Sequence, residues 1–232
     1  MTKTTTRTAT ALERAFAGNG GGARPTPMDA LREARRRWLN GDRLDMSALA
    51  HELRISRATL YSWVGSREKL IGEVLWSFAE EGLRQARAAA SGSGAARIVD
   101  VFQRFIRANA SFEPLCRFVE QDPELALRVL TSKKSPVQGR MIAAARELLA
   151  HEVATGALTP ALDVDTLAYT LIRVAESFLY SDVIAGSEPD VARAVQVVRV
   201  LLHARPLPGS RLPVPPRPRR RGARTSSPRS RR

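Results

Sequence analysis

The chain has 232 residues, of which 44% are hydrophobic, so it is long enough to bury a sizeable core and most of it should fold. Strand signals are scarce, because the sequence has no run of β-branched alternation and no Asn-Gly or Asp-Gly hairpin turn between two such runs. Ala, Leu, Arg and Glu, which favour helices, dominate the middle of the chain. We therefore predict an all-α fold.

The formal net charge of +14 is concentrated at one end of the chain. Residues 203–232 hold ten Arg and no Lys, Asp or Glu, which leaves +4 for residues 1–202. The high isoelectric point therefore describes a tail more than a folded surface. Such a tail does not by itself identify a nucleic-acid partner, because basic tails also bind membranes.

Cys116 is the single cysteine, which excludes a disulfide within the chain and suits a reducing cytoplasm. We expect it to be a small buried apolar residue. No apolar run approaches the length of a membrane span, so we expect a cytoplasmic protein with no membrane partner. Residues 1–25 are Thr-rich, lack the apolar core of a secretory signal and end in a glycine run, and we interpret them as a disordered arm.

The first predicted helix covers 27–40, because Thr26 can cap it and Pro27 suits its first position. The sequence Asn40-Gly41-Asp42 is typical of a helix end. Gly65-Ser66 interrupts the helical pattern again, and Ser66 can cap a long helix over 67–90. The other predicted helices cover 46–53, 57–64, 95–111, 114–120, 122–131, 135–155, 163–184 and 188–203.

The two short helices predicted at 46–53 and 57–64 form a helix-turn-helix pattern. Ser56 is a suitable cap for the second helix, whose amide-rich start favours a nearby phosphate. Small polar residues occupy the outward face of this second helix, so its backbone can approach base edges in the major groove. The inward-facing apolar residues are Leu49, Ala50, Leu53, Ile55, Leu60 and Val64.

This pattern resembles the signature of the TetR family of transcriptional regulators. The residues that carry the resemblance are Leu49-Ala50, Ile55-Ser56-Arg57-Ala58-Thr59-Leu60-Tyr61 and Val64-Gly65-Ser66-Arg67-Glu68-Lys69-Leu70, and at the motif level it covers residues 28–80. Arg54 stands where the family has a turn glycine, so this turn should form at some strain. Val64 replaces an aromatic core residue, and Arg67 replaces a lysine that would contact phosphate.

The resemblance and the outward-facing pattern together predict the DNA-contacting residues. They are Met46, Ser47, Arg57, Ala58, Thr59, Tyr61, Ser62, Trp63 and Arg67. We interpret Tyr61 as a phosphate contact, although it could pack against the first helix of the motif. For Trp63 the sequence leaves two roles open, a place in the domain core and a contact with the DNA backbone.

The resemblance further implies a C-terminal helical domain that binds a small molecule and dimerises. The helix at 163–184 is apolar on two sides, so a second subunit is a natural partner for one of them. The predicted dimer residues are Leu171, Phe178, Leu179, Val195, Val198 and Leu202. The predicted ligand-binding residues are Phe105, Phe112, Phe118, Met141, Tyr169, Arg173 and Glu176.

Arg173 and Glu176 lie three residues apart. They can form either a structural ion pair or the polar group that binds a ligand in an otherwise apolar pocket. The stretch 173–190 is similar to a TetR subgroup associated with lactone-type signal degradation genes, which implies an acyl or lactone ligand. The implied units are an arm (1–25), a helix-turn-helix domain (26–66), a connecting helix (67–90), a ligand-binding and dimerisation domain (95–203) and a disordered Arg/Pro-rich tail (204–232).

The predicted function is that of a homodimeric regulator of transcription, a repressor that a small apolar ligand releases from a near-palindromic double-stranded DNA operator. The alternative is a sequence-blind architectural nucleic-acid binder that uses the basic tail. Catalysis is not expected, because His51, His151 and His203 lack metal-ligand spacing and no Gly-rich phosphate loop or nucleophile elbow is present. No cofactor and no metal are expected.

Overall fold

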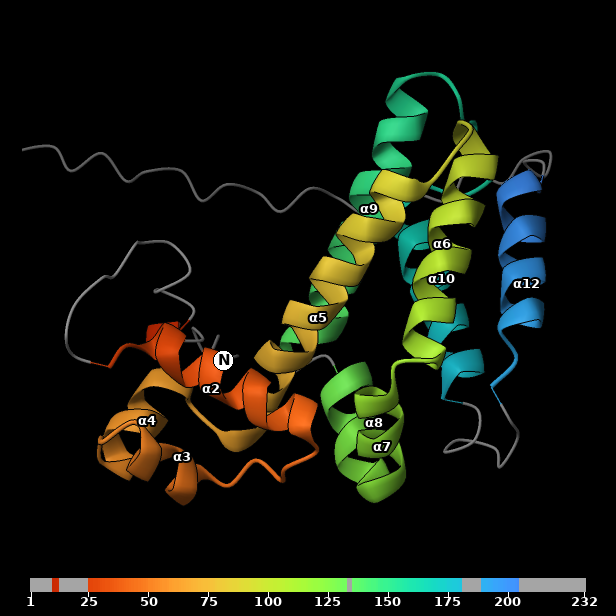
Figure 1. Cartoon of the computed structure of the whole chain (residues 1–232). Coiled ribbons are helices and arrows are strands. Elements are labelled where there is room, and N and C mark those ends of the chain that lie inside the picture. The colour runs from red at the N-terminus through yellow and green to blue at the C-terminus, as the bar shows by residue number, and fades with distance from the viewer. Residues whose placement is uncertain (1–9, 13–24, 133–134, 181–188, 205–232) are drawn as a thin grey trace, which may run out of the picture.

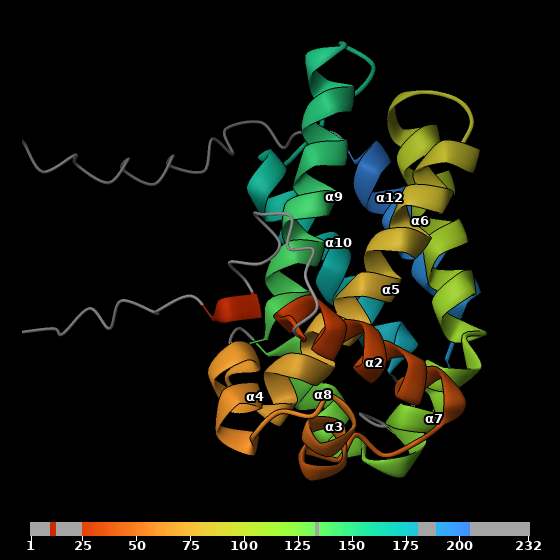
Figure 2. The same ribbon diagram turned by 60° about the vertical axis from the view of Figure 1, so that its left-hand side comes forward.

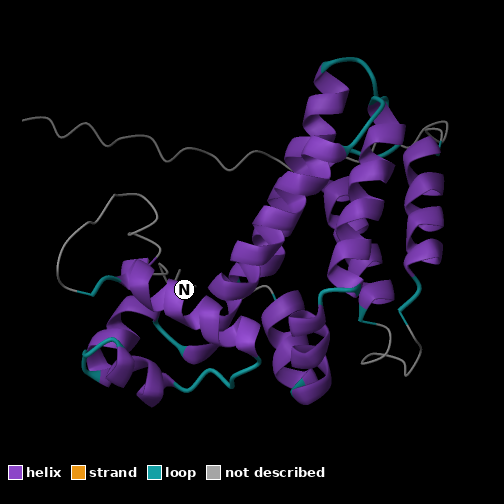
Figure 3. Cartoon of the chain, in the orientation of Figure 1, coloured by secondary structure: helices purple, strands orange, loops and turns teal. Residues whose placement is uncertain are grey.

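The computed structural model describes residues 10–12, 25–132, 135–180 and 189–204 of the chain, which is helical along most of these ranges (Figure 1). The helices are α2 (Pro27–Asn40), α3 (Met46–Glu52), α4 (Arg57–Val64), α5 (Arg67–Ala89), α6 (Gly94–Ala110), α7 (Glu113–Gln121), α8 (Pro123–Thr131), α9 (Pro136–Ala154), α10 (Val164–Leu179) and α12 (Val191–His203). The described part of the chain contains no strand (Figure 3), and the all-α prediction is confirmed.

The helices are arranged as a small lobe and a bundle. In Figure 1, α2, α3 and α4 form the lobe at the lower left, and α5 runs obliquely from it into the bundle. Helices α6 and α9 pack on the far half of α5, α10 packs on α9, and α12 lies on the other side of the bundle against α6 and α10. Helices α7 and α8 lie beside the lobe, as the turned view in Figure 2 also shows. Helix α5 is therefore shared between the two parts.

Side-chain caps fix where the helices of the lobe begin. The Thr26 hydroxyl accepts a hydrogen bond from the Asp29 amide at 3.3 Å, and the Asp29 carboxylate accepts one from the Thr26 amide at 2.8 Å, which completes a capping box before Pro27. The Ser56 hydroxyl accepts from the Thr59 amide at 3.0 Å at the start of α4. The predicted helix starts at 27 and 57 are confirmed, because each cap satisfies amides that the first turn leaves free.

Two buried apolar clusters form the core. The first joins the inner faces of α2, α3 and α4 to the first half of α5 and continues into α7 and α8, with Leu49, Leu60 and Leu125 among its members. The second lies between α6, α9, α10 and α12 and includes Leu149 and Val198. The lobe thus has no separate core, because its apolar side chains pack against helices that follow it in the chain.

The end of α10 and the N-terminal arm differ from the elements predicted from the sequence. Helix α10 ends at Leu179, with Tyr180 at its C-cap, and not at residue 184; residues 181–188 lie outside the described ranges. Within the predicted disordered arm, Leu12 is buried in the first core cluster, so residues 10–12 are packed. The rest of the arm and the tail beyond residue 204 lie outside the described residues. No helix in the described ranges is long and apolar enough to cross a membrane.

Candidate DNA-binding surface and ligand cavity

The turn between α3 and α4 is built on Arg54, which adopts a left-handed backbone with φ of 53°. The Ile55 amide donates to the Ala50 carbonyl at 3.0 Å and the Arg54 amide donates to the His51 carbonyl at 3.0 Å, which is the hydrogen-bond pattern of a Schellman helix end. Glycine suits this position because a side chain crowds the backbone there. The expected strained turn at Arg54 is confirmed.

Replacing Arg54 with glycine should stabilise the protein by about 1 kcal/mol, because the gain from removing left-handed strain of about 1–2 kcal/mol exceeds the cost of the conformational entropy that glycine adds to the unfolded chain. Urea denaturation of the two proteins measures the difference. Arg54→Ala is the matched control, since it removes the charged side chain but keeps Cβ, and it should give no such gain. Equal stabilisation by both variants would show that the side chain and not the backbone is strained.

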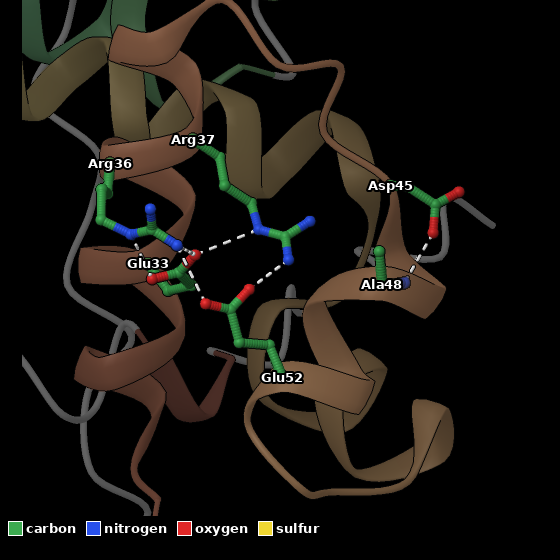
Figure 4. Close-up of polar contacts among 6 residues, drawn as sticks. All are labelled: Glu33, Arg36, Arg37, Asp45, Ala48 and Glu52. Carbon is green, nitrogen blue, oxygen red and sulfur yellow. Dashed lines mark hydrogen bonds and ion pairs between the residues drawn. The ribbon is translucent and has the colours of Figure 1, made fainter.

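A charged network ties α2 to the end of α3 (Figure 4). Glu52 accepts hydrogen bonds from Arg36, at 2.9 Å, and from Arg37, and Glu33 accepts from the same two arginines at 2.6 and 3.1 Å. The hydrogen bond from Arg36 is the main reason why the pKa of Glu33 lies below its usual range. The network holds α3, the first helix of the motif, against α2, so that α4, the second helix, can face outward from the lobe.

Asp45 caps the start of α3, as Figure 4 also shows. Its carboxylate accepts a hydrogen bond from the Ala48 amide at 2.7 Å, and this bond is the main cause that lowers the pKa of Asp45. With Ser56 at the next helix start, both helices of the motif have a side-chain cap. The turn, the caps and the network together fix how α4 is presented.

The outward face of α4 is open to solvent. Arg57, Ala58 and Ser62 are exposed, and Tyr61 is 37% exposed. The Thr59 hydroxyl lies 2.8 Å from the Ser56 hydroxyl and is half-buried at the rim of this face. Since Leu60 and Val64 are fully buried, the predicted division of α4 into an inward apolar side and an outward small, polar side is confirmed.

Three predicted DNA-contacting residues have other surroundings. The Met46 side chain is 5% exposed in the first core cluster and is not open to a partner there, whereas Ser47 beside it is exposed. Trp63 is half-buried and packs against the same cluster. Arg67 is half-buried, and its Nε donates to the Leu44 carbonyl at 2.8 Å, which fastens α5 to the segment before α3.

A cavity of ≈ 70 Å³ lies between α5, α6, α9 and α10, closed at one end by the start of α7. Phe105, Phe112, Met141 and Glu176 line it, so these four predicted ligand residues are brought together. The other three are not. Tyr169 is 53% exposed, Phe118 packs on Trp38, and Arg173 is exposed and reaches Glu176 from outside the cavity.

Glu176 is the charged group in the cavity wall, and it is buried apart from 9% of its surface. Arg173 Nη1 donates to its Oε2 at 2.5 Å, which confirms the predicted pair, and Gln138 Nε2 donates to its Oε1 at 3.2 Å. Burial raises the pKa of Glu176, while the bond from Gln138 and the charge of Arg173 act in the opposite direction. Burial and the Glu176 charge also raise the pKa of Tyr180 beside it.

Most of the predicted dimer residues face the inside of one chain. Leu171, Val195, Val198 and Leu202 belong to the second core cluster between α6, α9, α10 and α12, so within one chain they are not exposed for the predicted contact with a second subunit. Leu179 lines the cavity, and Phe178 is half-buried. The large apolar side chains that α10 and α12 expose are Tyr169 and Val200, at 53% and 66%.

An aromatic cluster connects the lobe to the cavity. Trp38 of α2 stacks on Phe78 of α5 with ring centroids 5.5 Å apart and lies 6.0 Å from Phe112, and Phe78 and Phe112 are 5.4 Å apart. Phe78 and Phe112 both line the cavity as well. One layer of rings therefore separates the space inside the bundle from the first helix of the lobe.

Sequence reasoning missed several of the residues that build these sites. The i, i+3 and i, i+4 spacings of Glu33 with Arg36 and Arg37 could have suggested the charged network. Gln138 and Tyr180 carried no signal, because their proximity to Glu176 comes from the packing of α9 on α10 and from the C-cap of α10.

Comparison with known proteins supports the resemblance noted in the sequence. Residues 93–203 match the family model "Tetracyclin repressor-like, C-terminal domain". The solved structure of the transcriptional repressor QsdR of the TetR family from R. erythropolis shares 31% identity with this chain, covers 77% of this chain and 95% of its own, and superposes with a TM-score of 0.73. No curated protein matches.

Two further solved structures are similar at lower identity. The TetR family transcriptional regulator PfmR from Thermus thermophilus shares 20% identity over 75% of this chain and 96% of its own, with a TM-score of 0.39. A transcriptional regulator from Pseudomonas aeruginosa shares 16% over 75% and 85%, with a TM-score of 0.45. On the strength of the family model and of the R. erythropolis repressor, this chain belongs to the TetR family of transcriptional regulators.

Proposed function

We propose that this chain is a homodimeric, sequence-specific repressor that a small apolar molecule releases from its operator. The observation that carries the proposal is the open face of α4, where small exposed residues stand on the second helix of a motif whose two helices each have a side-chain cap, whose turn is strained and whose first helix is tied to α2 by a charged network. The R. erythropolis relative, described as a transcriptional repressor, supports repression over activation.

On DNA, Ala58, Thr59 and Ser62 would face base edges in the major groove, because they let the helix backbone approach closely. Arg57 and Tyr61 would contact phosphates on either side and set the position of the helix. Ser47, at the start of α3, would contact the phosphate backbone, and Trp63 would support α4 from the core side. Arg67 would act mainly through its hold on the Leu44 carbonyl.

The proposed dimer uses the outer faces of α10 and α12. The exposure of Tyr169 and Val200 there supports this choice, because both are large apolar side chains that an interface would cover. A two-fold axis beside these helices would present two copies of α4 to successive major grooves, which fits a near-palindromic operator.

Ligand release is supported by the shared wall of the cavity and the aromatic cluster. A ligand in this small cavity would press on the side chains that line it, and Phe78 and Phe112 among them pack on Trp38 of α2 on their other side. Ligand binding would thus favour another placement of the lobe relative to the bundle, and the two recognition helices of the dimer would no longer fit one operator.

Selection of bound sequences from a random DNA pool tests the proposal. The full chain should enrich a near-palindromic site whose half-site centres lie about 10 base pairs apart, or a multiple of that spacing. Thr59→Ala/Tyr61→Ala should weaken binding to this site at least about 100-fold, since the dimer loses four contacts and a total loss of about 3 kcal/mol already corresponds to about 100-fold. Light scattering should show that the double variant still has the mass of a dimer. Thr131→Ala on α8 is the matched control for DNA binding.

Unchanged affinity of the double variant would overturn the assignment of α4. Deletion of residues 206–232 separates the regulator from the sequence-blind alternative. The regulator keeps its preference for the selected site over random DNA without the tail, although its overall affinity falls at low salt. Loss of that preference together with the tail would favour the architectural binder.

A further inference from the structure

Two cavities follow one another along the bundle. Beyond the cavity at Glu176 lies a second one of ≈ 50 Å³, displaced away from the lobe along α5, α6, α9 and α10. On α9 the lining runs from Val137 in the first cavity to Leu148 in the second. Eleven residues of helix span about 16 Å, so the two cavities mark out a long narrow path.

Three side chains, Phe105, Met141 and Ile172, belong to the walls of both cavities. Met141 is half-buried and is the adaptable member of the three, because its unbranched chain has three rotatable bonds whereas Ile172 is stiff at χ1. It is therefore the shared wall residue whose change of rotamer we expect to open one cavity toward the other. The path therefore suits a single elongated ligand better than two small ones.

The two ends of the path differ in chemistry. The far cavity is lined by apolar side chains alone, among them Leu83, Val101 and Leu148. The near cavity contains the Glu176 carboxylate, to which Arg173 and Gln138 donate. A carboxylate has about four acceptor positions, so Glu176 can still accept from a ligand but cannot donate to one while it is ionised.

We propose that the regulatory ligand is a linear aliphatic molecule whose head group donates an N–H hydrogen bond to Glu176, with its chain passing Met141 into the far cavity; this rests on the ligand-released regulator proposed above. An alkylamine or an acyl chain attached through an amide meets this description. A bare lactone, which offers acceptors alone, does not, and a fatty carboxylate would place a second negative charge beside Glu176.

Calorimetric titration of the full chain, without DNA, tests the head group. The probes are decylamine, decanamide and sodium decanoate, each below its micelle concentration. Decylamine and decanamide should bind at least tenfold more tightly than decanoate. This order opposes the net charge of +14, which would draw decanoate to the protein surface. Glu176→Gln should reduce the difference to less than threefold, whereas Glu80→Gln, an exposed control on α5, should leave it unchanged.

A second experiment tests where the aliphatic chain of the ligand binds. From heptylamine to decylamine the affinity should rise about fourfold for each methylene, as expected for burial of a CH₂ group. Ala145→Leu, which fills the far cavity, should remove this rise while leaving the affinity for heptylamine within threefold. Equal binding of decanoate and decylamine, no dependence on length, or no binding of any probe would overturn the proposal. Each of these results leaves operator recognition by α4 standing, because DNA is absent from the titration.

Discussion

Gly94→Ala should destabilise the protein by about 3 kcal/mol or more, which is a large part of the stability of a typical domain. A Cβ at this position would lie 2.1 Å from the Ala157 carbonyl oxygen, and the backbone has a left-handed φ of +59°. The Gly94 amide also donates to the buried Glu152 carboxylate at 2.7 Å. A shift of α6 away from Ala157 would therefore remove a hydrogen bond from a buried charge. Backbone strain of about 1–2 kcal/mol adds to an overlap of about 1–3 kcal/mol.

Two other glycines in the described part of the chain separate these contributions. Gly156 has a left-handed φ of +74° but no atom within 4 Å of a new Cβ, so Gly156→Ala should cost the backbone strain alone, about 1–2 kcal/mol. Gly139 lies inside α9 with no neighbour within 4 Å, and Gly139→Ala should stabilise by about 1 kcal/mol. Urea denaturation ranks the three variants, and a Gly94→Ala protein as stable as Gly156→Ala would contradict the close approach of α6 to Ala157.

Local signals explain why most helix boundaries could be predicted. A cap acts within three residues, so Thr26, Ser56 and Ser66 determine where α2, α4 and α5 begin, wherever these helices pack. The helix-turn-helix is itself a local structure that runs from Met46 to Val64, and its inward and outward faces follow from helical spacing.

The C-terminal sites were harder to predict because they depend on which face of a helix meets which neighbour. Helix α10 is apolar on two sides, and spacing alone cannot tell the side that packs on α9 from the side that is exposed. Leu171 is buried in the core of one chain, whereas Tyr169, two residues earlier, is exposed. The predicted dimer and ligand residues were divided between these sides without that information. Tyr169 was therefore predicted to face the inside and Leu171 the outside, and their observed exposures are the reverse.

Trp38→Ala should cost about 3–5 kcal/mol, and the loss should be greatest in the lobe. Trp38 is 7% exposed in the last turn of α2 and contacts aromatic rings from α5 and α7 with centroids 5.5 to 6.2 Å apart. Through Phe78 and Phe112 it joins α2 to the cavity wall, where Arg35 of α2 also lies over the Phe78 ring, 4.5 Å from its centroid. Without the indole, the lobe loses its packing on Phe78 and Phe112, while the second core cluster between α6, α9, α10 and α12 stays intact.

Hydrogen exchange measured by mass spectrometry resolves this pattern along the chain. Amides of α2, α3 and α4 should exchange faster in Trp38→Ala, whereas amides of α9 and α10 should keep more of their protection. Trp38→Phe keeps a ring on Phe78 and should lose less than half as much free energy of unfolding. An equal loss of protection in α2 and α10 would mean that lobe and bundle unfold as one unit. In that case the aromatic cluster would not separate the lobe from the bundle energetically, and this support for ligand action through Phe78 and Phe112 would be lost.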